Sequence, residues 1–325
     1  MQPFTLVKAP GLDAAIVAAA APGSRYIAGG TDLLQLAKDH VETPTRLIDI
    51  EAFPLTGIEA SHQSLRLEAL ARMSDVGAHP AVKDGWPVIA QALEASASPQ
   101  IRNMGTMGGN LLQRTRCGYF RDTGFACNKR DPGSGCPAIP GEHRMHAILG
   151  VSEHCIATHA SDLAVALVAL DATLELRGPS NASRTIPVGA LHRVPGDTPH
   201  IETNLKPGEL IAAIIVPASV VARRSHYLKV RDRASFEFAI VSAAVGIEVA
   251  DGVIRDARVA AGGVGTKPWR LPEVETELVG KPLNPRTLAD AANQAGDGAR
   301  PARDNGFKLP LLRRTVLRAL QTVAA

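Results

Sequence analysis

The sequence predicts an α+β protein with two domains, over residues 1–220 and 221–325. Helical and strand-like segments alternate in the first fifty residues. Two long apolar segments, near 238–249 and 253–262, flank an Asp-Gly pair and predict an antiparallel hairpin, after which the chain to 325 is mostly helical. Between these regions, residues 113–159 show no periodicity. We place the domain border near 217–226, where Pro217 and a pair of arginines separate two strands.

Helices are expected where apolar residues recur every three or four positions, and strands where they alternate or form short runs. The first helix ends at Pro22-Gly23, and Ser161-Asp162 opens a later one. The expected helices lie near 12–21, 32–39, 88–97, 161–171 and over most of 271–325. The expected strands lie near 25–28, 46–50, 65–70, 173–177, 184–188, 210–216, 238–249 and 253–262. Residues 103–110 are expected to form a Gly-rich turn.

The composition is that of a globular enzyme, with 45% apolar and 21% charged residues and a net charge of +3. This balance excludes a fibre, a coiled coil and a surface that binds nucleic acid throughout. The longest uncharged stretch, Leu210–Ala222, is too short to cross a membrane. Asp13 opens the Ala-rich run near the N-terminus and Lys8 is the only basic residue before it. We therefore expect no signal peptide on this chain.

Two Gly-rich segments about seventy residues apart are candidates for holding a dinucleotide from two sides. The first leads from a strand through Gly29 and Gly30 into a helix, a pattern typical of phosphate binding, although an ordinary tight turn capped by Thr31 or Asp32 has the same pattern. The second, Arg102–Asn110, is either a binding turn or a flexible linker.

A strand exit with three cations, Tyr227–Arg233, is a further candidate. It could reach a flavin or a phosphate, or it could be a charged strand end.

All four cysteines lie in the non-periodic stretch: Cys117, Cys127, Cys136 and Cys155. Their spacing, C-x9-C-x8-C-x18-C, has no close zinc-type knuckle and favours an iron–sulfur cluster, while zinc, structural thiols and disulfides stay open. The same stretch is rich in cations that could offset the negative charge of a thiolate-bound cluster or dock an acidic partner. A zinc-stabilised module that docks nucleic acid or protein is the main alternative function.

Together, these segments resemble the FAD-binding medium subunit of the molybdenum hydroxylases, the xanthine dehydrogenase and aldehyde oxidoreductase family. The resemblance implies a two-part FAD-binding domain, with a small α/β unit near 1–53 and a larger α+β unit near 54–220. A smaller C-terminal domain with an antiparallel sheet and helices follows. It implies FAD contacts, first around the pyrophosphate, from Arg25, Tyr26, Ile27, Ala28, Gly29, Gly30, Thr31, Asp32 and Leu33. Further FAD contacts are implied for Thr106, Gly109, Asn110, Asp162, Ile211 and Lys229.

The cysteine-bearing insertion, about 113–159, is similar to that of the periplasmic aldehyde oxidoreductases, whose FAD subunit holds an additional [4Fe–4S] cluster. The four cysteines are then the expected metal ligands. The family implies a heterotrimer with a molybdopterin-binding large subunit and a [2Fe–2S] small subunit. FAD would pass electrons to an external acceptor such as a ferredoxin, a quinone, a cytochrome or dioxygen. We expect no catalytic acid, base or nucleophile here, no nucleic-acid partner, and a location that is cytoplasmic, or periplasmic by co-export with a partner subunit that carries a signal.

Overall fold

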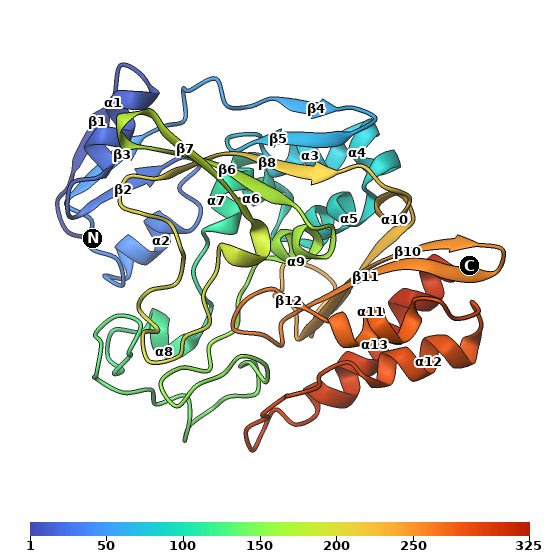
Figure 1. Ribbon diagram of the computed structural model, residues 1–325. Helices are drawn as coiled ribbons and strands as arrows, with labels where there is room; N and C mark the ends of the chain where they lie inside the picture. Colours follow the sequence, from blue (N-terminus) through green and yellow to red (C-terminus); the bar gives the residue numbers. More distant parts are fainter.

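The computed structural model describes all 325 residues (Figure 1). The chain begins with a three-stranded parallel sheet of order β1-β3-β2, made of β1 (Thr5–Lys8), β3 (Arg46–Asp49) and β2 (Ser24–Ile27). The helices α1 (Leu12–Ala19) and α2 (Leu33–Lys38) alternate with these strands. This is the small α/β unit that we expected, with β1 as an additional edge strand.

The second unit is built on a five-stranded antiparallel sheet of order β4-β5-β8-β6-β7. Its strands are β4 (Ile58–Ala60), β5 (Ser64–Glu68), β8 (Leu210–Pro217), β6 (Thr173–Gly178) and β7 (Ala182–Pro187). Its helices are α3 (Met73–Ala78), α4 (Pro80–Gly85), α5 (Pro87–Ala95), α6 (Pro99–Met104), α7 (Met107–Leu111) and α9 (Asp162–Ala169), with short 3-10 turns at Pro179–Asn181 and Val188–Ala190. The central strand β8 is almost wholly buried, as its continuous apolar run predicts.

The C-terminal part is a four-stranded antiparallel sheet of order β12-β11-β10-β9, covered by helices. Its strands are β9 (Ser225–Val230), β10 (Val241–Ala250), β11 (Val253–Gly262) and β12 (Trp269–Arg270), and its helices are α10 (Val220–Arg223), α11 (Pro272–Leu278), α12 (Pro285–Asn293) and α13 (Lys308–Ala324). The expected hairpin turns at Asp251-Gly252, both with positive φ. These sheets and helices confirm the expected fold class. The domain border at residue 220 stays a prediction.

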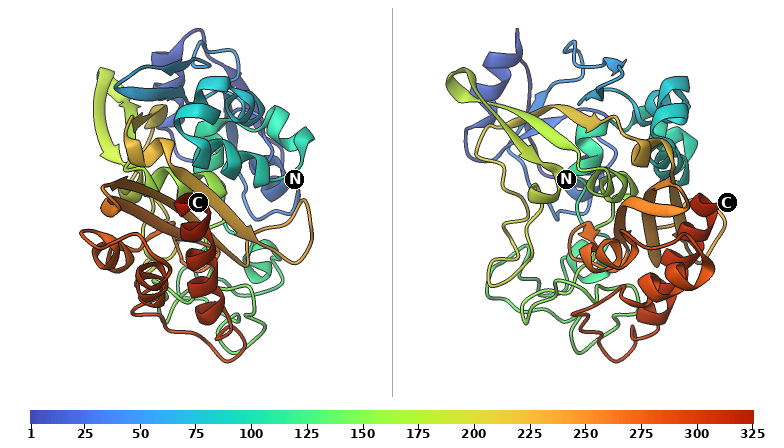
Figure 2. Two further views of the ribbon diagram at one scale, coloured as in Figure 1. Left: turned by 90° about the vertical axis from the view of Figure 1, so that its right-hand side faces the viewer. Right: turned by 45° about the vertical axis from the view of Figure 1, so that its right-hand side comes forward.

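The cysteine-bearing insertion has one regular element, the single-turn helix α8 (Gly118–Arg121), in agreement with its lack of periodicity. Figure 2 shows the insertion as a green lobe at one end of the molecule, beside the C-terminal helices. Hydrogen bonds from the C-terminal domain hold the insertion in this position. The buried Lys308 ammonium donates to the carbonyls of Met145, His146 and Gly263 at 2.9, 2.9 and 2.7 Å, and Asn305 donates to the carbonyls of His143 and His146.

One expected element is wrong: residues 103–110 do not form a single turn but lie in the two short helices α6 and α7. Both helices begin at a residue whose hydroxyl caps the backbone. Ser98 accepts a hydrogen bond from the Ile101 N–H, and Thr106 accepts one from the Gly109 N–H. Pro99 at the first helical position of α6 adds to this preference.

None of the helices combines the length and the apolar character that a membrane crossing requires.

Candidate functional site

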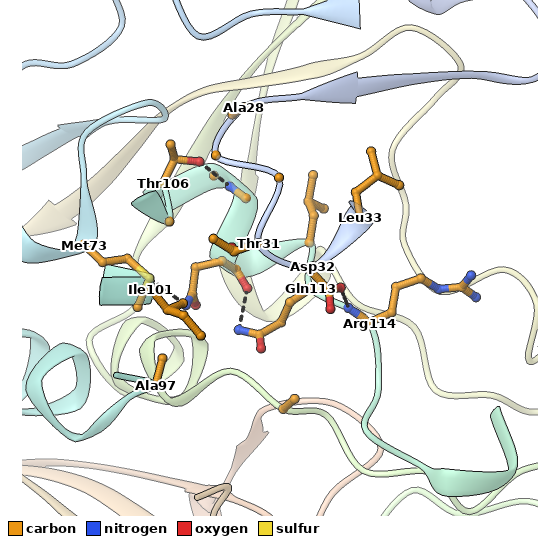
Figure 3. Close-up of a pocket in the computed structure, with 18 of the residues that line it drawn as sticks. Ala28, Thr31, Asp32, Leu33, Met73, Ala97, Ile101, Thr106, Gln113 and Arg114 are labelled. Carbon is orange, nitrogen blue, oxygen red and sulfur yellow. Dashed lines mark hydrogen bonds between the residues drawn. The ribbon is translucent and has the colours of Figure 1, made fainter. Parts of the chain in front are cut away.

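A cavity of about 510 Å³ lies where the parallel sheet, the second unit and the β9–β10 connection meet (Figure 3). This volume is in the range of cofactor sites. The structure brings all fifteen residues expected from the sequence into its lining: Arg25, Tyr26, Ile27, Ala28, Gly29, Gly30, Thr31, Asp32, Leu33, Thr106, Gly109, Asn110, Asp162, Ile211 and Lys229. Residues from β2, α7, α9, β8 and β9 therefore face one space, although they are spread over two hundred positions of the chain.

The glycines at the exit of β2 are there for reasons of backbone geometry. Gly30 has φ = 66°, a left-handed conformation that residues with a Cβ rarely adopt. A Cβ on Gly29 would lie 1.9 Å from the carbonyl oxygen of Met104. The two Gly-rich segments are thus in direct contact, as expected for segments that enclose one ligand. A Cβ on Gly30 would point at the Leu34 side chain, so this glycine serves the turn itself.

The second Gly-rich segment is tied to the helix that carries Asp162. The Asn110 amide oxygen accepts a 2.6 Å hydrogen bond from the Ser161 hydroxyl, which also caps α9. The Asn110 amide nitrogen lies 3.3 Å from the Met73 sulfur. These contacts hold α7, α9 and α3 together around the cavity, and they orient the Asn110 side chain from two neighbouring helices.

A buried ion pair lies at the end of the cavity nearest the C-terminal domain. Lys229 donates to one Asp162 carboxylate oxygen at 2.7 Å, and the Tyr227 hydroxyl donates to the other at 2.5 Å. Ser96 donates to the first oxygen at 3.1 Å. The Asp162 and Lys229 side chains are 6% and 4% exposed, so neither charge is solvated by bulk water. The pair is stable because each charge has its partner and further hydrogen bonds.

We predict that Asp162→Asn lowers the free energy of unfolding by about 3–5 kcal/mol, because it leaves the Lys229 ammonium buried without a counter-charge. Urea unfolding of the cofactor-free protein measures this. The matched control is Glu175→Gln, which breaks the partly exposed Arg66–Glu175 pair and is expected to cost less than about 1 kcal/mol. Equal losses in the two variants would contradict the prediction.

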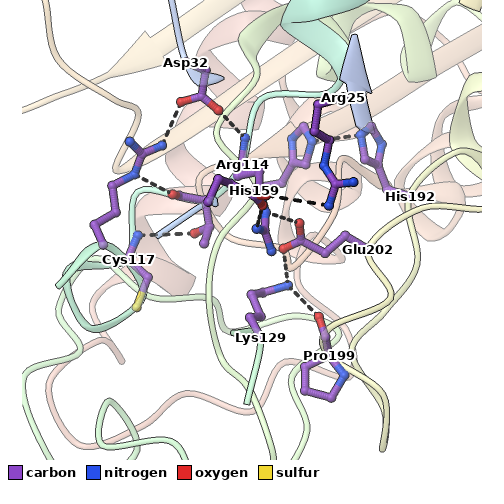
Figure 4. A network of polar contacts seen from close by, with 12 residues as sticks. Arg25, Asp32, Arg114, Cys117, Lys129, His159, His192, Pro199 and Glu202 are labelled. Atoms are coloured by element: carbon purple, nitrogen blue, oxygen red, sulfur yellow. Dashed lines mark hydrogen bonds and ion pairs between the residues drawn. The ribbon is translucent and has the colours of Figure 1, made fainter. Parts of the chain in front are cut away.

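Asp32 is fixed by the cysteine-bearing insertion, a contact that the sequence analysis missed. Its carboxylate accepts from the Arg114 backbone N–H (Figure 4) and from Arg121, both at 2.8 Å, and forms an ion pair with Arg116 at 2.7 Å. Arg114 also pairs with Glu202, which in turn pairs with Lys129 at 2.7 Å. Of the cations that suggested a cluster environment or a docking face, Arg116 and Arg121 therefore join the insertion to the first Gly-rich turn.

The connection from β9 to β10 lines the mouth of the cavity, and its residues beyond Arg233 were also missed. It contributes Arg233, Phe236, Glu237 and Phe238. Phe236 and Phe238 are 51% and 39% exposed, and the Arg116 guanidinium lies 5.0 Å from the centre of the Phe238 ring. This connection places an apolar surface with nearby charges at the cavity entrance.

The four cysteines come together around one small cavity, which Phe120, Asn128 and Lys129 also line. All four are free thiols, so the structure contains none of the disulfides that the spacing left open. Burial raises the pKa of Cys117 to about 12, although the backbone N–H groups of Phe120 and Tyr119 act in the opposite direction. Burial likewise raises the pKa of Cys136 and of Cys155. No three His, Cys, Asp or Glu side chains converge as the ligands of a single metal ion would.

A buried histidine pair lies between the insertion and the second unit (Figure 4). The Nε2 atoms of His159 and His192 are 3.1 Å apart, and His192 Nε2 lies 2.8 Å from the Leu111 carbonyl oxygen. Burial lowers the pKa of His192 to about 4 and holds that of His159 well below its ordinary value. Both rings are therefore neutral in the folded protein at neutral pH.

This pair predicts acid destabilisation. Between pH 6.5 and 4, an unfolded histidine binds a proton that the folded ring does not, so the free energy of unfolding is highest above pH 6.5 and falls as the pH falls. Within this range, each ring changes the free energy of unfolding by about 1.4 kcal/mol per pH unit. Urea unfolding at pH 7 and at pH 5 measures this pH dependence. We expect His192→Gln, whose amide can still donate to Leu111, to reduce the slope. An unchanged slope in that variant would contradict this assignment.

The large cavity, which residues of both Gly-rich segments line, has the size expected of a cofactor site. Residues 2–219 match the family described as the FAD-binding domain in molybdopterin dehydrogenase, and residues 226–323 match the CO dehydrogenase flavoprotein C-terminal domain. The chain belongs to this family of FAD-binding oxidoreductase subunits. FAD is its cofactor, as the resemblance implied.

Two curated relatives and a solved structure agree with this family. The chain is 46% identical over 318 residues to the aldehyde oxidoreductase FAD-binding subunit PaoB of Escherichia coli (strain K12), covering 96% of this chain and 95% of that one. It is 30% identical to the glyceraldehyde dehydrogenase medium chain of Sulfolobus acidocaldarius, covering 87% and 83%. A chain of the carbon monoxide dehydrogenase structure from Hydrogenophaga pseudoflava shares the fold, with a TM-score of 0.77, 24% identity and 99% and 97% coverage.

Proposed function

We propose that this chain is the FAD-binding, [4Fe–4S]-containing electron-transfer subunit of a molybdenum-dependent aldehyde oxidoreductase. The observation that carries the proposal is the single cavity lined by residues of both Gly-rich segments and of α9, β8 and β9. The 46% identity to an aldehyde oxidoreductase FAD-binding subunit supports the substrate class. Bound FAD supplies a group that accepts and releases electrons singly or in pairs.

The cavity residues would bind and orient FAD. The first turn, Gly29–Asp32, would offer backbone N–H groups to the pyrophosphate in a conformation that Gly29 and Gly30 make possible. We place the flavin ring toward the C-terminal domain, near Ile211 and Lys229, because this end combines apolar walls with the buried ion pair. Phe236 and Phe238 would cover the ring and exclude water at the mouth.

The cysteines fit an iron–sulfur cluster better than a single ion. They are free, they line one cavity, and backbone N–H groups point at Cys117, Cys136 and Cys155, as is common at cluster sulfurs. The ligands of a cluster bind different corners, so their sulfurs need not meet at one point as zinc ligands do. Lys129 adds a positive charge near Cys155 that would favour bound thiolates.

The proposal includes a molybdopterin-binding large subunit and a [2Fe–2S] small subunit as partners. Electrons from an aldehyde would reach this chain through the small subunit and leave through FAD to an external acceptor, such as a ferredoxin, a quinone, a cytochrome or dioxygen. The compartment is the cytoplasm, or the periplasm where a partner subunit carries the export signal. We propose no catalytic acid, base or nucleophile on this chain.

Cofactor analysis of the chain co-purified with its partners tests the proposal. We expect one FAD and about four iron atoms per copy of this chain, beyond the iron of the small subunit. Flavin without this additional iron would refute the cluster but keep the family assignment. A colourless chain with one zinc atom would favour the docking module instead, an alternative that the family matches over 2–219 and 226–323 do not support.

A further inference from the structure

A second cavity, of about 290 Å³, lies between the large cavity and Cys117. It shares its lining with the large cavity at Arg116, Ala160, Asp162, Glu237 and Phe238. It shares Cys117 with the small cysteine cavity. The proposed flavin site and the proposed cluster site are thus connected by a space that neither site uses.

Unpartnered polar atoms are concentrated around this second cavity. Six buried side-chain nitrogen or oxygen atoms in the chain have no hydrogen-bond partner, and three of them belong to lining residues: Arg116 Nε, His146 Nδ1 and Ser242 Oγ. Ser242 is fully buried and His146 is 7% exposed. Buried polar groups are almost always hydrogen-bonded, so this grouping indicates a polar ligand that satisfies them.

The charges around the second cavity indicate that this ligand is neutral. Each charged lining side chain has a counter-charge: Arg116 pairs with Asp32, Asp162 with Lys229, and Glu237 with Arg233 at 3.6 Å. His146 places its Nε2 3.1 Å from the Cys117 sulfur, which leaves Nδ1 free to accept from the ligand. Water matches these groups, since it both donates and accepts, and each molecule needs only about 30 Å³.

We propose that the second cavity binds a chain of ordered water molecules that exchanges protons between the flavin and solvent. The inference rests on the proposed function. Bound FAD would take up or release protons as it exchanges electrons singly with iron–sulfur clusters, which carry no protons, so these protons would need a route of their own. The waters on Arg116, His146 and Ser242 provide this route toward the partly exposed Glu237 at the mouth.

Ser242→Val tests the proposal in the purified complex, because valine removes the hydroxyl, fills space and suits strand β10. We expect reoxidation of the reduced flavin by ferricyanide, an acceptor that takes single electrons and no proton, to slow at least about tenfold, with a larger solvent deuterium isotope effect. The control is Ser24→Val, at a buried serine of β2 whose hydroxyl also lacks a partner and which lines neither cavity. An unchanged rate in Ser242→Val would overturn the proposal.

A crystal structure of the complex gives a second readout that does not depend on activity. We expect ordered waters within hydrogen-bond distance of Arg116 Nε, His146 Nδ1 and Ser242 Oγ, and their loss or displacement in Ser242→Val. A cavity without waters on these atoms, or filled by another molecule, would overturn the proposal. FAD and iron analysis of the same wild-type preparation tests the proposed function separately, so a failure of either can be recognised.

Discussion

Replacing Cys127 with serine is expected to reduce the additional iron from about four atoms per chain to nearly none. A serine oxygen is a harder and more basic ligand than a thiolate, and loss of one of four protein ligands opens a corner of the cluster to solvent. Cys127 lies in the middle of the insertion and lines the small cavity with the other three cysteines. Iron analysis, together with the absorbance of the cluster, measures the effect.

The matched control for this variant is Asp131→Asn, an exposed position four residues further along the same loop. It keeps every thiol and removes a charge that has no ion-pair partner, so we expect iron and FAD contents equal to those of the wild type. If Cys127→Ser retained about four iron atoms per chain, Cys127 would not be a ligand and the proposed cluster would need another donor. Iron loss in both variants would mean that the loop, and not the thiolate, is sensitive.

Much of the fold follows from local patterns that the sequence displays directly. Strand β8 is recognisable because its apolar run is buried on both sides, and the β10–β11 hairpin because an Asp-Gly pair separates two apolar segments. Strand β1 was not predicted because its four residues are mostly exposed at a sheet edge and show no alternation. The helices α6 and α7 were not predicted because their caps compete with the turn preference of the glycines.

For the candidate site, residues within the two Gly-rich segments were predictable, whereas the contacts that orient them were not. Three donors of the insertion meet on Asp32 from positions more than eighty residues away, and nothing in the spacing of Arg114, Arg116 and Arg121 indicates this. Phe236 and Phe238 lie in an exposed connection without periodicity. Hydrogen bonding between His146 and Cys117 depends on how the insertion folds back on itself, which local preference does not determine.

Replacing Gly30 with valine is expected to abolish FAD binding. Two reasons are conceivable: a side chain could fill the space of the pyrophosphate, or it could disturb the backbone of the turn, and the structure favours the second. A Cβ on Gly30 points toward Leu34, 2.9 Å from its terminal methyl group, and the flexible end of that side chain could move. The φ of 66° cannot be relieved in the same way, because a β-branched residue is strongly disfavoured in the left-handed region. The turn would rearrange and its N–H groups would lose their common direction.

A comparison of Gly30→Val with Gly30→Asn separates these two reasons. Asparagine has a side chain of similar size but adopts the left-handed conformation far more readily. If backbone geometry decides, Gly30→Asn retains most of its FAD while Gly30→Val retains almost none; if occupied space decides, both lose it. Flavin absorbance per chain gives the occupancy. Gly85→Val, at a glycine with negative φ and open space around its Cβ position, controls for a general effect of valine on folding. Full occupancy in Gly30→Val would show that the first Gly-rich turn does not hold the pyrophosphate.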